Sequence, residues 1–305
     1  MLGLLQTTLE LGLISSLTVL ALFLSYTMLN VCDLSTDGCF TLGASVGAMV
    51  ALSGHPVLAI FAAAGAGIIS GFVVSILQTK MGIDSLLSGI IVNTGLYSIN
   101  IAIMNNSSLV NLNKSETVFT IAKRLLQNTF LASWYKTIVA LIFVILVILF
   151  LSLFLKTRLG LAIRATGNNQ AMVKASSINP ALTTIIGLCI ANAFTAISGC
   201  LLAAQQKSAN IDIGSGMVTV ALASLLIGNA FMGKGNITKR AIGAVLGAII
   251  FRLVYTIAIR FNMPASMLKL VSSVIVIVAI SGPYLKSKYP VLLRKMALKK
   301  ENRNA

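Results

Sequence analysis

Stretches of about 20 predominantly apolar residues, each long enough to cross the hydrocarbon core of a bilayer as a helix, follow one another along almost the whole chain. We expect about nine such spans, at approximately 10–30, 34–53, 56–79, 83–104, 134–155, 181–205, 216–232, 241–259 and 266–284. Only 10% of the residues are charged, against about 25% in soluble domains, which leaves too little polar surface for a water-soluble protein. The sequence therefore predicts an all-α, polytopic membrane protein with a single transmembrane domain over 1–305.

The positions of the charges predict how the chain is oriented. The net charge is +16, but the cations fall in short clusters between apolar stretches and form no basic face interleaved with aromatic residues, which argues against nucleic-acid binding. Placing segment 156–180 inside puts fifteen Lys and Arg residues inside and seven outside. Cytoplasmic loops carry the excess of cations, so we expect the N-terminus outside and the tail, 285–305, inside.

Two parts of the chain resemble each other. Asp33 and Asp212 are each followed by an Ala-Ser pair and then a Gly at the same offsets. The first copy covers about 31–104 and the second about 210–284, and the predicted topology gives them opposite directions. An inverted repeat of this kind is common in transporters, whereas chance similarity between Gly/Ala-rich helices is the alternative.

Glycines are frequent in the predicted spans, and they indicate close helix packing; they are Gly43, Gly47, Gly65, Gly67, Gly71, Gly243 and Gly247.

Polar residues interrupt the apolar pattern at 31–41 and 210–216. A carboxylate at the lipid-facing centre of a helix costs about 2.5–3.5 kcal/mol, so Asp33, Asp37 and Asp212 should face protein, water or the bilayer edge. These segments are either capped helix ends or half-helix ends that line a pathway, and both can hold together. The residues that we predict to line the pathway are Asp33, Ser35, Thr36, Asn93, Asp212, Ser215 and Ser224.

Segment 156–180 is a polar loop with its own short helix. Gly167 and Asn168 are expected to start this helix, and Pro180 prevents its continuation. Ala171, Ala175 and Ile178 then share one face. The order Arg164-Ala165-x-Gly167-Asn168, then Ala175, Ile178 and Asn179, resembles the loop of permease subunits in bacterial ATP-binding-cassette importers of the branched-chain amino acid and ribose type. Ser177 stands where that family usually has Gly.

The resemblance covers roughly residues 15–285, because three further motifs follow in the family's order. They are Asp33-Leu34-Ser35 with Gly43-Ala44, then Gly214-Ser215-Gly216, and then the glycines from Gly233 to Gly247. It implies a non-catalytic subunit of the bacterial plasma membrane without cofactor or metal. A second permease subunit, identical or different, two cytoplasmic ATP-binding subunits and an extracytoplasmic solute-binding protein would be its partners.

The resemblance also implies that segment 156–180 couples to the ATPase, through Arg164, Gly167, Asn168, Ala171, Ala175, Ile178 and Asn179. Gly228 to Lys234 matches the start of a phosphate-binding loop, but Gly235 replaces the hydroxyl that would bind Mg²⁺. ATP hydrolysis is therefore expected in another polypeptide. An amino acid, including an aromatic one, is the substrate that the resemblance favours.

Two other kinds of transport protein fit the apolar pattern. An ion-coupled secondary transporter would use Asp33, Asp84 or Asp212 as its buried carboxylate. A passive channel would need none of the partners named above. Arg252 lies within the eighth predicted span, where it either pairs with Asp212 or extends its side chain to the lipid headgroups.

Overall fold

The computed structural model describes residues 2–113, 115–127, 133–232 and 235–260, and, further along, 270, 273, 274, 276–278 and 281. The ninth predicted span, 266–284, lies largely outside these residues, and the tail at 285–305 lies wholly outside them. Six helices of the described part are long and apolar enough to cross a membrane, and two shorter apolar helices accompany them. The prediction of an all-α polytopic membrane protein is confirmed.

The first half of the chain contains a broken span followed by three helices. Helix α1 (Leu2–Leu22) continues into a π-helical segment, η1 (Phe23–Met28), and α2 (Thr36–Leu52) begins after a break. Helices α3 (Pro56–Thr79) and α4 (Ser85–Ile103) follow. The first span starts earlier than expected, because the amides of Gln6 and Gln205 bond the carboxylate of the buried Glu10 and allow the helix to continue past this charge.

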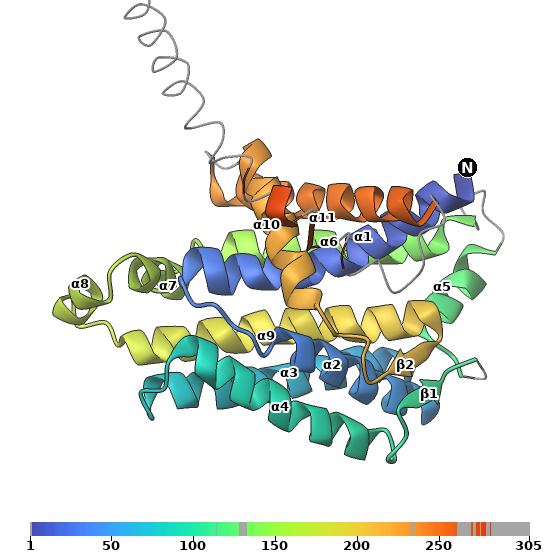
Figure 1. Cartoon of the computed structure of the whole chain (residues 1–305), viewed down its shortest axis with the longest axis horizontal. Helices are drawn as coiled ribbons and strands as arrows, with labels where there is room; N and C mark the ends of the chain where they lie inside the picture. The colour runs from blue at the N-terminus through green and yellow to red at the C-terminus, as the bar shows by residue number, and fades with distance from the viewer. Residues whose placement is uncertain are drawn as a thin grey trace, which may run out of the picture.

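Short elements connect the two halves at opposite ends of the bundle. At one end, strand β1 (Leu109–Asn111) precedes α5 (Val118–Leu126) and α6 (Tyr135–Phe154). At the other end, α7 (Arg158–Asn168) and α8 (Gln170–Ala175) project from the bundle (Figure 1).

The second half repeats the order of a long helix, a break and two further helices. Helix α9 (Pro180–Gln206) is followed by strand β2 (Ser208–Asn210), which pairs antiparallel with β1 so that Val110 lies opposite Ala209. Helix α10 (Met217–Met232) starts after the second break, and α11 (Ile237–Arg260) runs back along the bundle.

The two halves exchange their packing partners. Helices α2 and α3 of the first half pack on α9 of the second, whereas α10 and α11 pack on α1 of the first. Helices α1 and α9 consequently form the centre, with 83% and 67% of their most apolar stretches buried, against 28–33% in α3, α4, α6 and α11. The four outer helices have their remaining apolar surface free to face lipid.

Glycines permit the close approach of these helices. A side chain at Gly43 or Gly67 would overlap the backbone of α9, and one at Gly247 would overlap the carbonyl oxygen of Ser224 on α10. Gly65 differs, because a Cβ atom there would meet no atom within 4 Å. The prediction that glycines serve packing is correct at Gly43, Gly67 and Gly247.

Candidate functional site

The first break, between η1 and α2, is held by the carboxylate of Asp33. Its Oδ1 accepts the backbone N–H of Ser35 at 2.8 Å, and its Oδ2 accepts the side-chain amide of Asn192, on α9, at 2.9 Å. Only 2% of Asp33 is exposed. Both oxygens have partners, so the cost of burying this charge is offset within the protein.

The second break is joined to the first through Asp37, in the first turn of α2. The Oδ1 atom of Asp37 accepts the N–H of Val218 at 2.8 Å, and its Oδ2 accepts the N–H of Gly216 at 2.9 Å. The N-terminal ends of α2 and α10 therefore meet at one carboxylate. From there α2 runs along the bundle toward the end that carries β1 and β2, whereas α10 runs obliquely across the bundle (Figure 1). A negative charge at a helix N-terminus is favourable because it satisfies free amides and complements the helix dipole.

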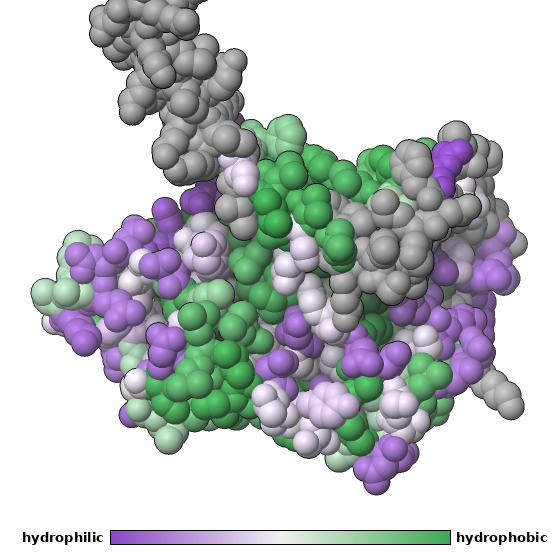
Figure 2. Space-filling view, in the orientation of Figure 1, coloured by the Kyte–Doolittle hydropathy of each residue, from purple (hydrophilic) through white to green (hydrophobic). Residues whose placement is uncertain are grey.

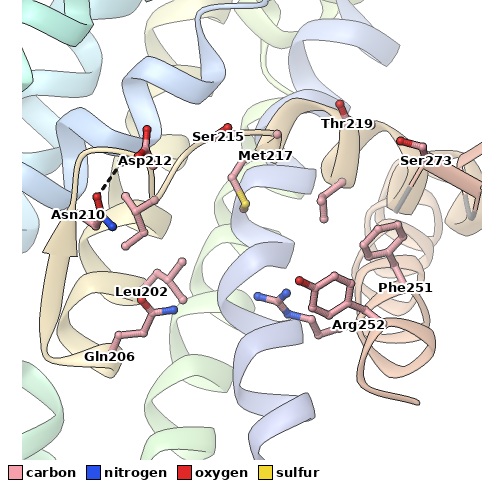
Figure 3. Close-up of a pocket in the computed structure, with 14 residues that line it drawn as sticks. Leu202, Gln206, Asn210, Asp212, Ser215, Met217, Thr219, Phe251, Arg252 and Ser273 are labelled. Carbon is pink, nitrogen blue, oxygen red and sulfur yellow. Dashed lines mark hydrogen bonds between the residues drawn. The ribbon is translucent and has the colours of Figure 1, made fainter. Parts of the chain in front are cut away.

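Two cavities flank this junction, and both contain Asp212 and Ser215. The first, of about 520 Å³, lies between the second break, α2 and α4; its polar lining comprises Asp37, Thr41, Asn93, Thr94, Tyr97, Ser98, Asn100, Asp212 and Ser215. The second, of about 530 Å³, lies between the second break, α9 and α11 (Figure 3); its polar lining includes Gln206, Asn210, Asp212, Ser215, Thr219, Arg252 and Tyr255. We call them the α4 cavity and the α11 cavity.

The junction also lies beneath a polar area of the molecular surface. Figure 2 shows hydrophilic and intermediate residues crossing the middle of this face, between areas of strongly hydrophobic residues. Thr94, Tyr97 and Ser98 of α4 and Asp212 and Ser215 of the second break are exposed. Polar groups in the middle of apolar helices are poorly satisfied by lipid, so this area indicates contact with water or protein.

The structure brings three of the seven predicted pathway residues to the cavities, namely Asn93, Asp212 and Ser215. The other four do not line either cavity: Asp33, Ser35 and Thr36 are buried at the first break, and Ser224 is buried within α10. Five further polar residues that the sequence pattern did not indicate also line the cavities: Thr41, Tyr97, Asn100, Gln206 and Asn210. The spacing of Asn93, Tyr97 and Asn100 on α4, four and three residues apart, is a signal that would have identified that polar face.

Arg252 of α11 lines the α11 cavity, and no described residue is an acidic partner for it. Arg252 and Asp212 do not form the direct ion pair. Among the described residues, the one salt bridge joins Arg124 to Glu116. The guanidinium lies over the ring of Tyr255, 5.5 Å from its centroid. The Nε atom is fully enclosed and has no hydrogen-bond partner in the described part of the chain.

The loop between α6 and α9 folds differently from the expectation in one detail. Helix α7 continues through Gly167 and Asn168, and it is Asn169 whose side chain accepts the N–H of Met172 and starts α8. Gly167 instead packs against the backbone of η1 at Met28, where a Cβ atom would overlap the carbonyl oxygen.

Helix α8 presents an apolar surface to solvent. Val173 is buried and fixes α8 to the bundle, whereas Ala171, Met172 and Ala175 are exposed and Ile178 is half-buried. Arg164 is half-buried on α7. The side chain of Asn179 accepts the N–H of Ala181 and begins α9. Ser177 has φ = +58°, a conformation that glycine adopts without cost.

The described residues include no group of three or more His, Cys, Asp or Glu side chains placed to hold a metal ion. The carboxylates at the junction instead accept hydrogen bonds, as Asp33 and Asp37 do, or line the cavities, as Asp212 does.

Comparisons with known proteins relate the whole of this architecture to transport. The family described as "Branched-chain amino acid transport system / permease component" matches residues 4–280. A tyrosine transport system permease protein of Clostridioides difficile is 33% identical over 267 residues, 87% of this chain and 86% of that protein.

More distant sequences are sugar permeases. A ribose import permease protein of Escherichia coli is 25% identical over 232 residues, 72% of this chain and 66% of its own length. A fructose import permease protein of Bifidobacterium longum is 28% identical over 159 residues, 51% of this chain and 44% of its own length. No solved structure matches the chain significantly. On the match over residues 4–280, the protein belongs to the family of branched-chain amino acid transport system permease components.

Proposed function

We propose that this protein forms one half of the solute pathway of an importer that a separate ATPase drives. The observation that carries the proposal is the meeting of the N-terminal ends of two half-helices at Asp37, beside two polar cavities. Half-helix ends at membrane depth are where transporters of inverted-repeat construction bind their solutes. The exchange of packing between the halves supports such a repeat, over about 31–104 and 210–284.

A second permease subunit, the same or different, closes the pathway. The exposed polar residues Thr94, Tyr97 and Ser98 lie on a membrane-spanning helix, where lipid would leave their hydroxyl groups unsatisfied. A partner subunit facing this surface would enclose a watery path between the two chains. An extracytoplasmic solute-binding protein would deliver the solute to that path.

Two cytoplasmic ATP-binding subunits dock on α7 and α8. The exposed Ala171, Met172 and Ala175 offer an apolar contact surface, and α7 packs on both η1 and α9. Because η1 leads directly into the first break, a displacement of α7 is transmitted to the junction at Asp37. Nucleotide binding thereby shifts the population between inward-open and outward-open states.

The solute is an amino acid, and aromatic amino acids are among the candidates. The tyrosine permease from Clostridioides difficile is similar over most of both chains, and the α11 cavity combines charged groups with Phe251 and Tyr255.

Replacing Ala175 with Asp tests the docking. The variant places a charge in the apolar contact, where desolvation without a partner costs several kcal/mol. The tagged variant should insert normally but lose copurification of the ATPase. Leu125→Asp, on the exposed side of α5 at the opposite end (80% exposed), should retain it. Undiminished copurification of the ATPase with Ala175→Asp would contradict the proposed docking.

An ion-coupled carrier is the competing function, and it needs a carboxylate free to bind a cation or proton. Both oxygens of Asp33 are already bonded, and Asp84 caps α4 through the N–H of Leu86. Asp212 is the candidate that remains, because among the described residues only its backbone groups are engaged. Uptake into proteoliposomes that requires ATP and is unchanged when ion gradients are dissipated would support the ATP-driven importer. Uptake driven by an ion gradient alone would support the carrier.

The protein lies in the plasma membrane of a bacterium. The end that carries α7 and α8 faces the cytoplasm, and the N-terminus is outside. In a background without native cysteines, Ser107→Cys, near β1, should react with a membrane-impermeant maleimide in intact cells. Lys174→Cys, on α8, should react only after the cells are opened. Labelling of position 174 in intact cells would reverse the orientation.

A further inference from the structure

Helix α5 lies at the end of the bundle that carries β1 and β2 (Figure 1). It packs on α6 and, to a smaller extent, on α9. Phe119 anchors it, because only 2% of this residue is exposed and its side chain belongs to the main core. One side of α5 is therefore fixed to the bundle.

The apolar part of α5 extends beyond the side that the bundle covers. Apolar residues recur at spacings of three and four, as in an amphipathic helix, at Val118, Ile121, Ala122, Leu125 and Leu126. Ile121 and Leu125 are four residues apart and so are neighbours on one face. Leu125 is 80% exposed, more than any other large apolar side chain of the described residues, and Ile121 is only half-buried. These two residues form an apolar strip that the described part of the chain leaves largely open.

The remaining side of α5 carries positive charge. Lys123 is exposed, and Arg124 forms a salt bridge with Glu116 in which the two side chains are 71% and 52% exposed. Lys136 begins α6 beside Tyr135, and Lys207 follows the last residue of α9. On α5 and the adjoining ends of α6 and α9, four cations thus accompany one carboxylate.

This end of the bundle lies where the bilayer meets water. Helix α6, on which α5 packs, has 20 residues, the length that crosses the hydrocarbon core. Trp134 is its N-cap and Tyr135 its first residue, and both residue types gather at the membrane–water boundary. Only 28% of the most apolar stretch of α6 is buried, so α6 faces lipid. Lipid is therefore the apolar phase next to α5.

We propose that α5 is an interfacial helix that lies between the bundle, the lipid and water. Phe119 faces the bundle, Ile121 and Leu125 enter the boundary between headgroups and acyl chains, and the cationic side lies among the headgroup phosphates. Helices with one apolar and one Lys/Arg-rich side lie in this way in a membrane surface. The partner is a phospholipid surface, and the positive charge of this end is complementary to anionic lipids.

The test is the fluorescence of a single tryptophan in the full chain, reconstituted into vesicles of phosphatidylcholine and phosphatidylglycerol. Trp134 is the only tryptophan of the chain, so Trp134→Phe removes the native signal. Leu125→Trp then reports on the apolar strip, and Lys123→Trp, on the cationic side of the same helix, is the matched control. Both replace exposed side chains. Acyl chains with or without bromine, which quenches tryptophan on contact, are present in both leaflets, so the direction of insertion does not matter.

Brominated lipid should reduce the emission of Leu125→Trp by about half or more, because interfacial helices reach the acyl chains. Bromine close to the headgroup should quench more than bromine at the chain end, since such helices lie at shallow depth. Lys123→Trp should keep nearly all of its emission.

The headgroup preference is measured with bromine on one lipid of the mixture at a time. Phosphatidylglycerol should quench Leu125→Trp more than phosphatidylcholine does. Arg124 lies three residues after Ile121 and so borders the apolar strip. Adding Arg124→Gln should consequently reduce the difference between the two lipids.

Equal emission of Leu125→Trp with and without bromine would overturn the proposal, and so would equal quenching at positions 123 and 125. Identical quenching by the two lipids would refute the role given to anionic headgroups. A blue shift of Leu125→Trp that appears only when the extracytoplasmic solute-binding protein is added would assign the strip to that protein instead of lipid.

Discussion

Asp37 is the residue on which the arrangement of the two breaks depends most. Its two oxygens bond two different amides of the second break, 179 and 181 residues away in sequence. An Asn at this position keeps one acceptor oxygen but presents an NH₂ group where the second oxygen was, so one of the two amides loses its partner.

Asp37→Asn should therefore lower the free energy of unfolding by about 1–3 kcal/mol, measured by the fluorescence of Trp134 during denaturation in detergent. Asp84→Asn is the matched control. Asp84 caps α4 with a single hydrogen bond from Leu86, and Asn caps a helix about as well as Asp. Equal effects of the two substitutions would show that Asp37 does not join the half-helices.

Ser177 has a left-handed backbone in the turn between α8 and α9. Such a conformation costs a residue with a Cβ atom about 1–2 kcal/mol, and a β-branched side chain tolerates it least. Ser177→Ile should accelerate proteolytic cleavage of segment 156–180 in the purified protein, whereas Ser177→Gly should leave cleavage unchanged or slow it. Slower cleavage of Ser177→Ile than of Ser177→Gly would exclude this explanation.

At the level of the helices, the packing of α3 on α9 is the most extensive between any two described helices. Gly67→Ala should lower the thermal stability, because the added methyl group overlaps the carbonyl oxygen of Asn192 and overpacking costs about 1–3 kcal/mol. Gly65→Ala, on the same helix, should be neutral or stabilising, because nothing lies within 4 Å and Ala favours a helix by up to about 1 kcal/mol. Equal melting temperatures for the two variants would argue against this helix contact.

The elements that the sequence predicts well are those set by local apolar length. The third predicted span, 56–79, has the same limits as α3, which Pro56 starts. The sequence pattern predicts the start of α8 two residues early, because Asn169 and not Gly167 supplies the cap. A cap depends on one side-chain hydrogen bond, and the composition of this loop offers several candidates for it.

The candidate site was only partly predictable, for a physical reason. A polar residue at membrane depth must find a partner, but the sequence does not say whether that partner is a ligand or another side chain. Asp33 has its partner in Asn192, 159 residues away, whereas Asp212 and Ser215 face the cavities. These cases are distinguished only by contacts between residues far apart in the sequence. Such contacts cannot be read from the spacing of residues along the chain.

In the whole molecule, α7 and α8 at one end connect to the junction of half-helices in the middle. Helix α7 packs on η1 and α9, and these elements hold the first break through Asp33 and Asn192. A docked ATPase that moves α7 should consequently change the access of solutes to Ser215, which lies between the two cavities.

The most direct measurement is the rate at which a membrane-impermeant maleimide labels Ser215→Cys from outside, in the assembled transporter without its native cysteines. Labelling should change several-fold between the nucleotide-free and the vanadate-trapped states, because the population shifts between outward-open and inward-open forms. Adding Ala175→Asp should abolish that change while basal labelling remains. Identical rates in both nucleotide states, or a nucleotide effect that survives Ala175→Asp, would contradict an ATPase-driven pathway at this junction.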